Sequence, residues 1–273
     1  MNITLSSKKI SLLTAATVMG IAIFVGMGTA TAGIKGSKHD LGTGGAGQDT
    51  SSATGEVCVF CHTPHGANTA AKAPLWNKTL PAAGSFTRYS SLGTSTLDGS
   101  EAAVGSVSLA CLSCHDGSQA MDVMINKPGS GGYTAGGANM GAGVAMSGTP
   151  IPALGTDLSN DHPISIQYAG GGLTSADADG TYTSTSFGDK DFNSVQKATI
   201  NGNPVWWVDS NADTTRQKSE MMLYTRTDGA TQPFVECASC HDPHNAATAG
   251  AAQVAFLRTD NTNSEICLAC HNK

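Results

Sequence analysis

The sequence predicts a fold that is mostly coil, with short helices at four cysteine motifs, a few short strands and a core that side chains alone do not fill. Glycine supplies 33 of 273 residues, roughly 12% against a usual ~7%. Charged residues make up 13%, about half the usual ~25%, and aromatic residues only 5%. The chain also contains 8 Cys and 8 His, and these equal numbers are the first indication of what completes the core.

The first 32 residues predict an export signal. Lys8 and Lys9 precede an apolar run, residues 10–25, and Ala30 to Ala32 supply small residues at a cleavage site. The alternative is a retained membrane anchor, but the run is shorter than the ~20 residues that a spanning helix needs. We therefore expect cleavage after Ala32 and an exported chain without a membrane anchor. Loss of the two lysines would lower the formal charge from −6 to −8.

All eight cysteines fall into four pairs with two residues between the members, and a histidine follows each pair directly. Paired cysteines alone would predict disulfides in an exported chain, and zinc or redox chemistry in a cytosolic one. Neither explains the four histidines, whereas C-x-x-C-H is the attachment sequence of haem c. We therefore expect four covalent haem c groups, held by thioethers to Cys58, Cys61, Cys111, Cys114, Cys237, Cys240, Cys267 and Cys270, with His62, His115, His241 and His271 as proximal iron ligands.

The remaining histidines equal in number the distal positions of four haems, and are His39, His65, His162 and His244. His65 and His244 each lie three residues after a proximal histidine, in the strings CVFCHTPH and CASCHDPH. Three residues span at most ~10 Å, too little to reach the opposite face of the same porphyrin. Each should therefore ligate a different haem. We assign His65 to the Cys111/Cys114 haem and His244 to the Cys267/Cys270 haem, and leave His39 and His162 for the other two in an order that the sequence leaves open.

Methionine is the competing axial ligand, and it would raise the reduction potential. The chain offers several outside the signal. Because enough histidines are present, we expect packing roles for Met121, Met124, Met140, Met146, Met221 and Met222, and low potentials for the haems.

Along the chain, we expect a signal peptide at 1–32, an N-terminal dihaem block at 33–125, a Gly/Thr-rich insert with the axial His162 at 126–231, and a C-terminal dihaem block at 232–273. Helices should centre on the C-x-x-C-H motifs. Within the insert, residues 126–148 predict a Gly/Ala-rich loop. Residues 181–187 and 205–208 predict short strands, because they combine β-branched with aromatic side chains.

The chain resembles the secreted multihaem c-type cytochromes with doubled CxxCH motifs. The strings that carry the resemblance are SKHDL, CVFCHTPHGAN with APLWNK, CLSCHDGSQA, NDHPISIQY, and CASCHDPHNA with SEICLACHNK, about half of the mature chain. Residues 169–232 match nothing that we can place. The set is particularly similar to outer-surface tetrahaem cytochromes that stack into extracellular filaments. This resemblance implies a haem-dominated core of bis-histidine haems, and an axial histidine donated to a neighbouring subunit, for which His39 is best suited.

The leading functional hypothesis is electron transfer along closely spaced haems, with the chain itself, other redox proteins or extracellular acceptors as partners. The expected location is extracellular or at the outer cell surface, with the periplasm as the alternative. A multihaem reductase would need an open iron position, which the histidine count does not leave. A compact periplasmic tetrahaem shuttle fits the long insert poorly. The chain has fewer basic residues (15 Lys+Arg) than acidic ones (21 Asp+Glu). This excess of negative charge argues against a nucleic-acid partner and favours basic partners.

Overall fold

The computed structural model describes residues 33–47, 49–52, 54–128, 133–138, 145–146, 152–229, 231–245 and 256–272. The predicted signal at 1–32 lies outside these residues. In the part of the chain that is described, no helix is long and apolar enough to cross a membrane.

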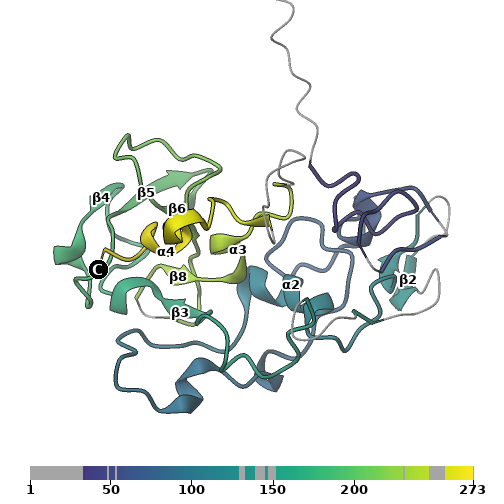
Figure 1. The fold of residues 1–273 in the computed structure, drawn as a ribbon, viewed down its shortest axis with the longest axis horizontal. Coiled ribbons are helices and arrows are strands. Elements are labelled where there is room, and N and C mark those ends of the chain that lie inside the picture. The colour runs from purple at the N-terminus through teal and green to yellow at the C-terminus, as the bar shows by residue number, and fades with distance from the viewer. Residues whose placement is uncertain are drawn as a thin grey trace, which may run out of the picture. The chain divides into compact units, whose positions relative to one another are not determined.

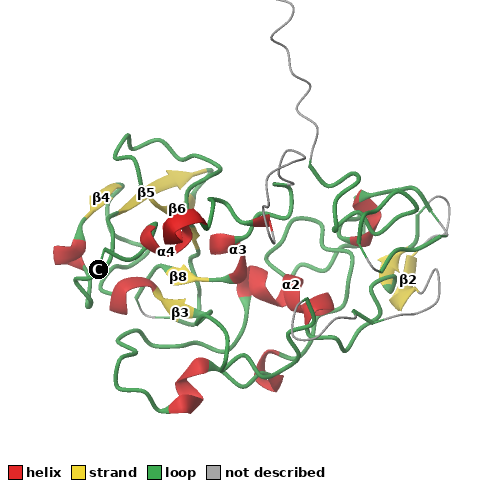
Figure 2. Cartoon of the chain, in the orientation of Figure 1, coloured by secondary structure: helices red, strands yellow, loops and turns green. Residues whose placement is uncertain are grey.

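The chain is mostly coil with short helical elements at the four motifs, as the sequence predicts (Figure 2). The elements are η1 (Cys58–Phe60), α2 (Ser106–His115), α3 (Cys237–Cys240) and α4 (Glu265–Leu268). In Figure 1 the labelled elements α2, α3 and α4 follow one another from the middle of the view toward the sheet. Five further 3-10 turns lie in the described coil: η2 (Ala83–Ser85), η3 (Tyr89–Leu92), η4 (Tyr168–Gly170), η5 (Ser184–Ser186) and η7 (Thr262–Ser264).

The principal sheet lies inside the predicted insert. Its four antiparallel strands have the order β4 (Gly180–Tyr182), β5 (Val195–Ile200), β6 (Asn203–Val208) and β7 (Met222–Leu223). The strand expected at 205–208 is confirmed as part of β6. The one expected at 181–187 is only partly right, because the chain leaves the sheet after Tyr182 and turns into η5.

Strand β5 was not predicted, although its hairpin with β6 has a clear local cause. Asn201 and Gly202 connect the two strands with φ values of 50° and 77°. An Asn-Gly pair is the favoured sequence for a two-residue hairpin turn with two left-handed residues. The β-branched Val195, Thr199 and Ile200 suit the pleated surface that follows from this pairing.

Two smaller antiparallel pairs complete the strands. They are β1 (Met124–Asn126) with β2 (Tyr133–Ala138), and β3 (Ile166–Gln167) with β8 (Phe234–Val235). Strand β2 corrects the expectation of a loop throughout 126–148, because residues 133–138 form a strand that pairs with β1. Much of the remainder of that segment lies outside the described residues.

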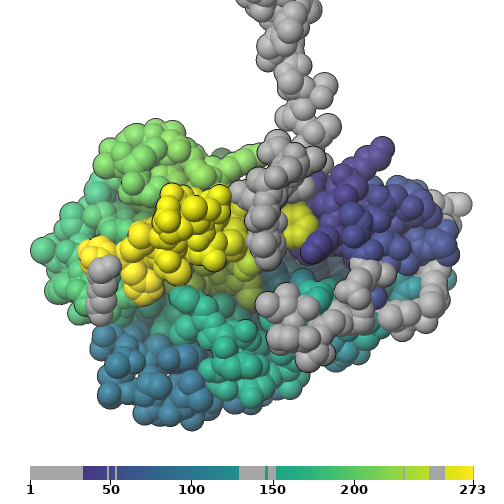
Figure 3. All heavy atoms as spheres, viewed as in Figure 1, coloured from purple at the N-terminus to yellow at the C-terminus, as the bar shows by residue number. Residues whose placement is uncertain are grey.

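Side chains form two apolar clusters. The larger surrounds fully buried Trp206 and Val195 of the sheet, and the cysteine-bearing segment around Ile266 packs against it. Figure 3 shows this yellow C-terminal segment lying against the green residues of the sheet region. The smaller cluster includes Leu109 and Leu112 of α2. Both clusters therefore support elements that carry haem motifs.

Buried polar groups connect the first motif to the second. Asn77 is fully buried and donates from Nδ2 to the carbonyls of Val59 (2.6 Å) and Asn126 (2.9 Å). Lys78 donates from Nζ to the carbonyls of Met121 (2.6 Å) and Val123 (2.8 Å). Because buried polar groups without partners cost about 1–3 kcal/mol each, these bonds hold η1 in one place relative to the chain that follows α2.

Candidate haem-binding site

Each C-x-x-C-H motif is closed by a helical turn. The histidine N–H donates to the carbonyl of the first cysteine at 2.8 Å for His62, 3.1 Å for His241 and 2.9 Å for His271. In the second motif the same residues form the last turn of α2. One turn places the two thiols on one side of the backbone with the histidine beside them, which is the arrangement that two thioethers and one axial imidazole require. None of the eight cysteines forms a disulfide.

Several of the thiols are desolvated and lie close to thiols of other motifs, whereas Cys58 and Cys267 are exposed. Desolvation raises the pKa of Cys61 and of Cys270 to about 12, and that of Cys240 to about 11. A hydrogen bond to Cys237 raises the pKa of Cys111 well above its usual range. The side chains of Cys111 in α2 and Cys237 in α3 are therefore in contact, so the second and third motifs are neighbours in space.

Two proximal histidines are oriented by backbone carbonyls. His62 Nδ1 lies 2.6 Å from the carbonyl oxygen of Pro74, and His115 Nδ1 lies 2.8 Å from that of Pro152. A carbonyl only accepts, so Nδ1 carries the proton in each ring and Nε2 keeps its lone pair. Histidines that bind a metal through Nε2 usually donate their Nδ1 proton to a carbonyl or carboxylate in this way.

Each of these two histidines faces a distal candidate at the same spacing. The ring centres of His62 and His244 are 6.1 Å apart with 16° between the planes, and those of His39 and His115 are 6.1 Å apart with 78° between the planes. A metal–imidazole bond is about 2 Å and the ring centre lies about 1 Å further, so two axial imidazoles on one metal have centres about 6 Å apart. The spacing of the rings at both places therefore fits an iron held between two histidines.

In the structure His244 lies beside His62 of the first motif, and His39 lies beside His115 of the second. The assignment of His65 to the Cys111/Cys114 haem and of His244 to the Cys267/Cys270 haem stays a prediction. His65 and His162 are exposed. The ring of His271 packs 4.4 Å from that of Phe192. Of the alternative ligands, Met121, Met124 and Met221 are buried, as packing roles require, whereas Met140 lies outside the described residues.

His39 has the most perturbed imidazole of the group. Burial and the nearby His115, His241 and His244 together lower its pKa to about 4, while the Pro243 carbonyl opposes the shift. Its ring also stacks on Phe256, with centres 4.2 Å apart. His39 is therefore neutral at physiological pH, the state in which an imidazole binds a metal. The supporting aromatic rings Phe192 and Phe256 carried no local signal by which sequence reasoning could have found them.

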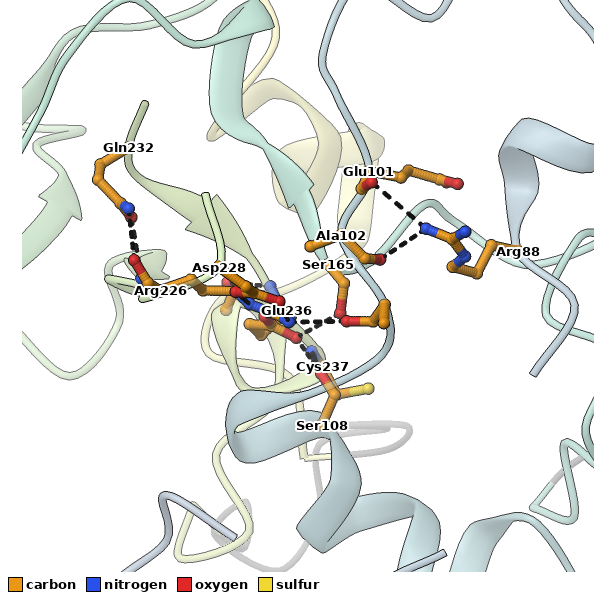
Figure 4. Close-up of polar contacts among 12 residues, drawn as sticks. Arg88, Glu101, Ala102, Ser108, Ser165, Arg226, Asp228, Gln232, Glu236 and Cys237 are labelled. Atoms are coloured by element: carbon orange, nitrogen blue, oxygen red, sulfur yellow. Dashed lines mark hydrogen bonds and ion pairs between the residues drawn. The ribbon is translucent and has the colours of Figure 1, made fainter. Parts of the chain in front are cut away.

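A buried polar network joins α2 to α3 beside the touching cysteines (Figure 4). Glu236, whose side chain is fully buried, accepts hydrogen bonds from Ser108 of α2 (2.5 Å) and from Ser165 (3.1 Å). Arg226 donates to it at 3.0 Å and also reaches the carbonyl of Ala103 (2.7 Å). Glu236 further forms a capping box with Ser239 at the start of α3. Its carboxylate thus determines how the second and third motifs meet.

Burial raises the pKa of Glu236, and the hydrogen bonds from Ser108 and Arg226 oppose that rise. These donors therefore offset part of the cost of its lost hydration. Asp228, which binds the other side of the Arg226 guanidinium, has its pKa lowered by that contact.

Comparison with known proteins gives a match over the last two motifs. The family model described as the doubled CXXCH motif matches residues 232–273, which contain α3, α4 and the last two motifs. No curated protein matches the chain. The family match supports a multihaem c-type cytochrome, a haem-binding electron-transfer protein with covalently attached haem c.

Replacing Arg226 by Met should destabilise the protein by about 3–5 kcal/mol, because it leaves a buried carboxylate without its cation. The substitution should raise the Glu236 pKa further. Since a carboxyl with a raised folded-state pKa loses stability as pH rises through that pKa, the destabilisation should be larger at pH 8 than at pH 5. Urea unfolding at the two pH values measures this, with exposed Arg216→Met as the control. Equal losses at both pH values would show that Glu236 is not the group responsible.

Proposed function

We propose that this protein is a tetrahaem c-type cytochrome that carries electrons from haem to haem in extracellular respiration. The observation that supports this most strongly is that two imidazole pairs have ring centres 6.1 Å apart, one pair at the first motif and one at the second. The cysteines of these two motifs also lie close to cysteines of other motifs. A bound haem would supply an iron that alternates between ferric and ferrous states as one electron enters and leaves. The chain's residues hold it by thioethers, fill both axial positions and limit water access.

In this proposal His62 and His244 are the axial ligands of the Cys58/Cys61 haem, and His115 and His39 are those of the Cys111/Cys114 haem. The first pair would tie the N-terminal and C-terminal dihaem blocks together, since 182 positions of the printed sequence separate the two histidines. His241 and His271 are the proximal ligands of the remaining haems, and His65 and His162 are their distal candidates.

We further propose that the protein is exported by its N-terminal segment and acts as a subunit of a polymeric filament, with a monomeric periplasmic shuttle as the second candidate. The 6.1 Å spacing supports an intramolecular role for His39. His65 and His162 are exposed and are therefore the histidines available to a neighbouring chain. The acidic balance of the chain favours basic redox partners.

Intact-mass measurement of the exported protein should show four haem additions and loss of the first 32 residues. Replacing both Cys58 and Cys61 by Ala should remove one haem and leave three. The native reduced protein should not bind carbon monoxide, because every iron has two protein ligands. Fewer than four additions would contradict the tetrahaem proposal, and carbon monoxide binding would favour a reductase with an open iron site.

The two histidine pairs should be distinguishable by electron paramagnetic resonance of the oxidised protein. Nearly perpendicular axial imidazoles give a highly anisotropic low-spin signal, whereas nearly parallel ones give an ordinary rhombic signal. His39→Ala should remove one anisotropic centre, and His244→Ala one rhombic centre. Phe256→Leu, which alters the ring stacked on His39 but removes no ligand, should retain both. An exchange of the two losses would mean that the pairing is wrong.

Electron microscopy of the secreted material should show filaments. His65→Ala and His162→Ala, tested separately, should identify any ligand that one subunit donates to another. The variant that lacks such a ligand would yield monomers that keep four haems and contain one high-spin iron, whereas the other variant would still form filaments. Discrete monomers from the unmodified protein would support the shuttle instead.

A further inference from the structure

The segment between β6 and β7 carries oxygen-bearing side chains at a distinctive spacing. It runs from Asp209 to Glu220, with Asn211 and Asp213 at alternate positions after the first residue. These occupy positions 1, 3, 5 and 12 of the calcium-loop pattern D-x-[DN]-x-[DN]-G-x₅-E. Positions 7 and 9 supply a backbone carbonyl and a further oxygen ligand in such loops, and here they are Thr215 and Gln217.

One position departs from the pattern in sequence but agrees with it in conformation. Calcium loops place glycine at position 6, where the chain turns sharply. Here that residue is Thr214, and its φ is 62°, in the left-handed region that a β-branched residue rarely adopts. The backbone therefore makes the turn of a calcium loop despite the unfavourable residue.

Backbone N–H groups already orient the side-chain oxygens of the loop. Asp213 N donates to Asn211 Oδ1 at 3.2 Å, Thr214 N to Asp209 Oδ2 at 3.0 Å, and Thr215 N to Asp213 Oδ1 at 2.7 Å. The chain thus wraps around the side chains at positions 1, 3 and 5, each of which retains lone pairs for a cation.

An independent observation comes from Glu220 at position 12. It is 1% exposed, and its Oε1 is buried without a hydrogen-bond partner, whereas Oε2 accepts from Gln217 N at 2.8 Å. Burial raises the Glu220 pKa, and the negative charges of Asp209 and Asp213 raise it further. A buried carboxylate oxygen without a hydrogen-bond partner, in the field of two further negative charges, lacks a group that compensates its charge.

We propose that residues 209–220 bind one calcium ion through the side chains of Asp209, Asn211, Asp213 and Glu220, with Thr215 and Gln217 completing the oxygen shell. All donors are hard oxygens, and the loop contains neither Cys nor His, which disfavours zinc. Calcium accepts such a protein-built shell, whereas magnesium usually retains several waters. Across the described residues, no three His, Cys, Asp or Glu side chains are grouped closely enough to hold a metal. Calcium binding would therefore have to bring the carboxylates of Asp209, Asp213 and Glu220 closer together.

The loop is placed to affect the fourth haem motif. Ser210 and Glu220 line a cavity of about 260 Å³ together with Glu265 and Leu268 of α4. Cys267 lies within this helix. Calcium binding would hold the loop closed on one wall of this cavity, so the ion should stabilise the sheet together with the segment that carries the last motif.

The test uses the full-length, haem-loaded protein after removal of metal with a chelator. Isothermal titration with CaCl₂ should show one site with a dissociation constant of about 10⁻⁴–10⁻³ M, the range of extracellular calcium modules. Calcium should also raise the thermal midpoint. MgCl₂ should bind at least about tenfold more weakly. The absence of saturable calcium binding, or equal binding of magnesium, would overturn the proposal.

Variants separate this site from the other acidic groups and from haem propionates. Asp213→Ala, at an exposed position, and Glu220→Gln should each weaken calcium binding at least tenfold. Thr214→Gly should strengthen it, because glycine adopts the left-handed conformation without strain. Asp157→Ala is the matched control, since Asp157 accepts from Ser159 in a similar local turn outside the pattern, and it should bind like the unmodified protein. Unchanged affinity in Asp213→Ala would show that the ion binds elsewhere. Neither result depends on the number of haems or their ligands.

Discussion

The arrangement of the motif helices depends most on the hydrogen bonds and the ion pair that the carboxylate of Glu236 forms. Elements of four to ten residues, such as α3 and α2, are too short to be stable alone, so tertiary contacts must hold them. With 5% aromatic residues, the chain has few large side chains for that purpose. Glu236 instead gathers Ser108, Ser165 and Arg226 from three other segments at one buried point. Directional hydrogen bonds fix the relative position of two segments more precisely than apolar contacts do. Such precision matters here, because the neighbouring thiols of Cys111 and Cys237 belong to different motifs.

Local features of the fold could be predicted from the sequence, and non-local ones could not. A C-x-x-C-H motif specifies its own helical turn, because the bond from the histidine N–H to the first cysteine carbonyl lies within five residues. The strand at 205–208 follows likewise from its own composition. Strand β5 was missed although Asn201 and Gly202 marked its hairpin, and β2 was missed because glycine-rich sequence hides a pairing that depends on its partner β1.

The histidine pairing was harder to predict for the same reason. Chain reach predicts that His244 and His241 of its own motif ligate different haems, but it gives no information on which distant haem lies nearby. The ring of His62 faces His244 because Asn77 and its neighbours hold the first motif in place and because α3 is fixed against α2. These contacts join residues far apart in the sequence, so no spacing rule contains them. By contrast, the pattern from Asp209 to Glu220 is entirely local, and sequence reading could have found it.

The proposed iron and calcium sites use different atoms but are organised in the same way. At the iron sites, the Pro74 and Pro152 carbonyls orient imidazoles by accepting their Nδ1 protons. At the calcium loop, backbone N–H groups orient anionic oxygens by donating to them. In both, turns of a few residues set the direction of a ligand atom through the main chain, so neither needs a large core of side chains for support. A glycine-rich, coil-rich chain is suited to this, because it leaves many backbone donors and acceptors outside regular helices and sheets, available to position ligands.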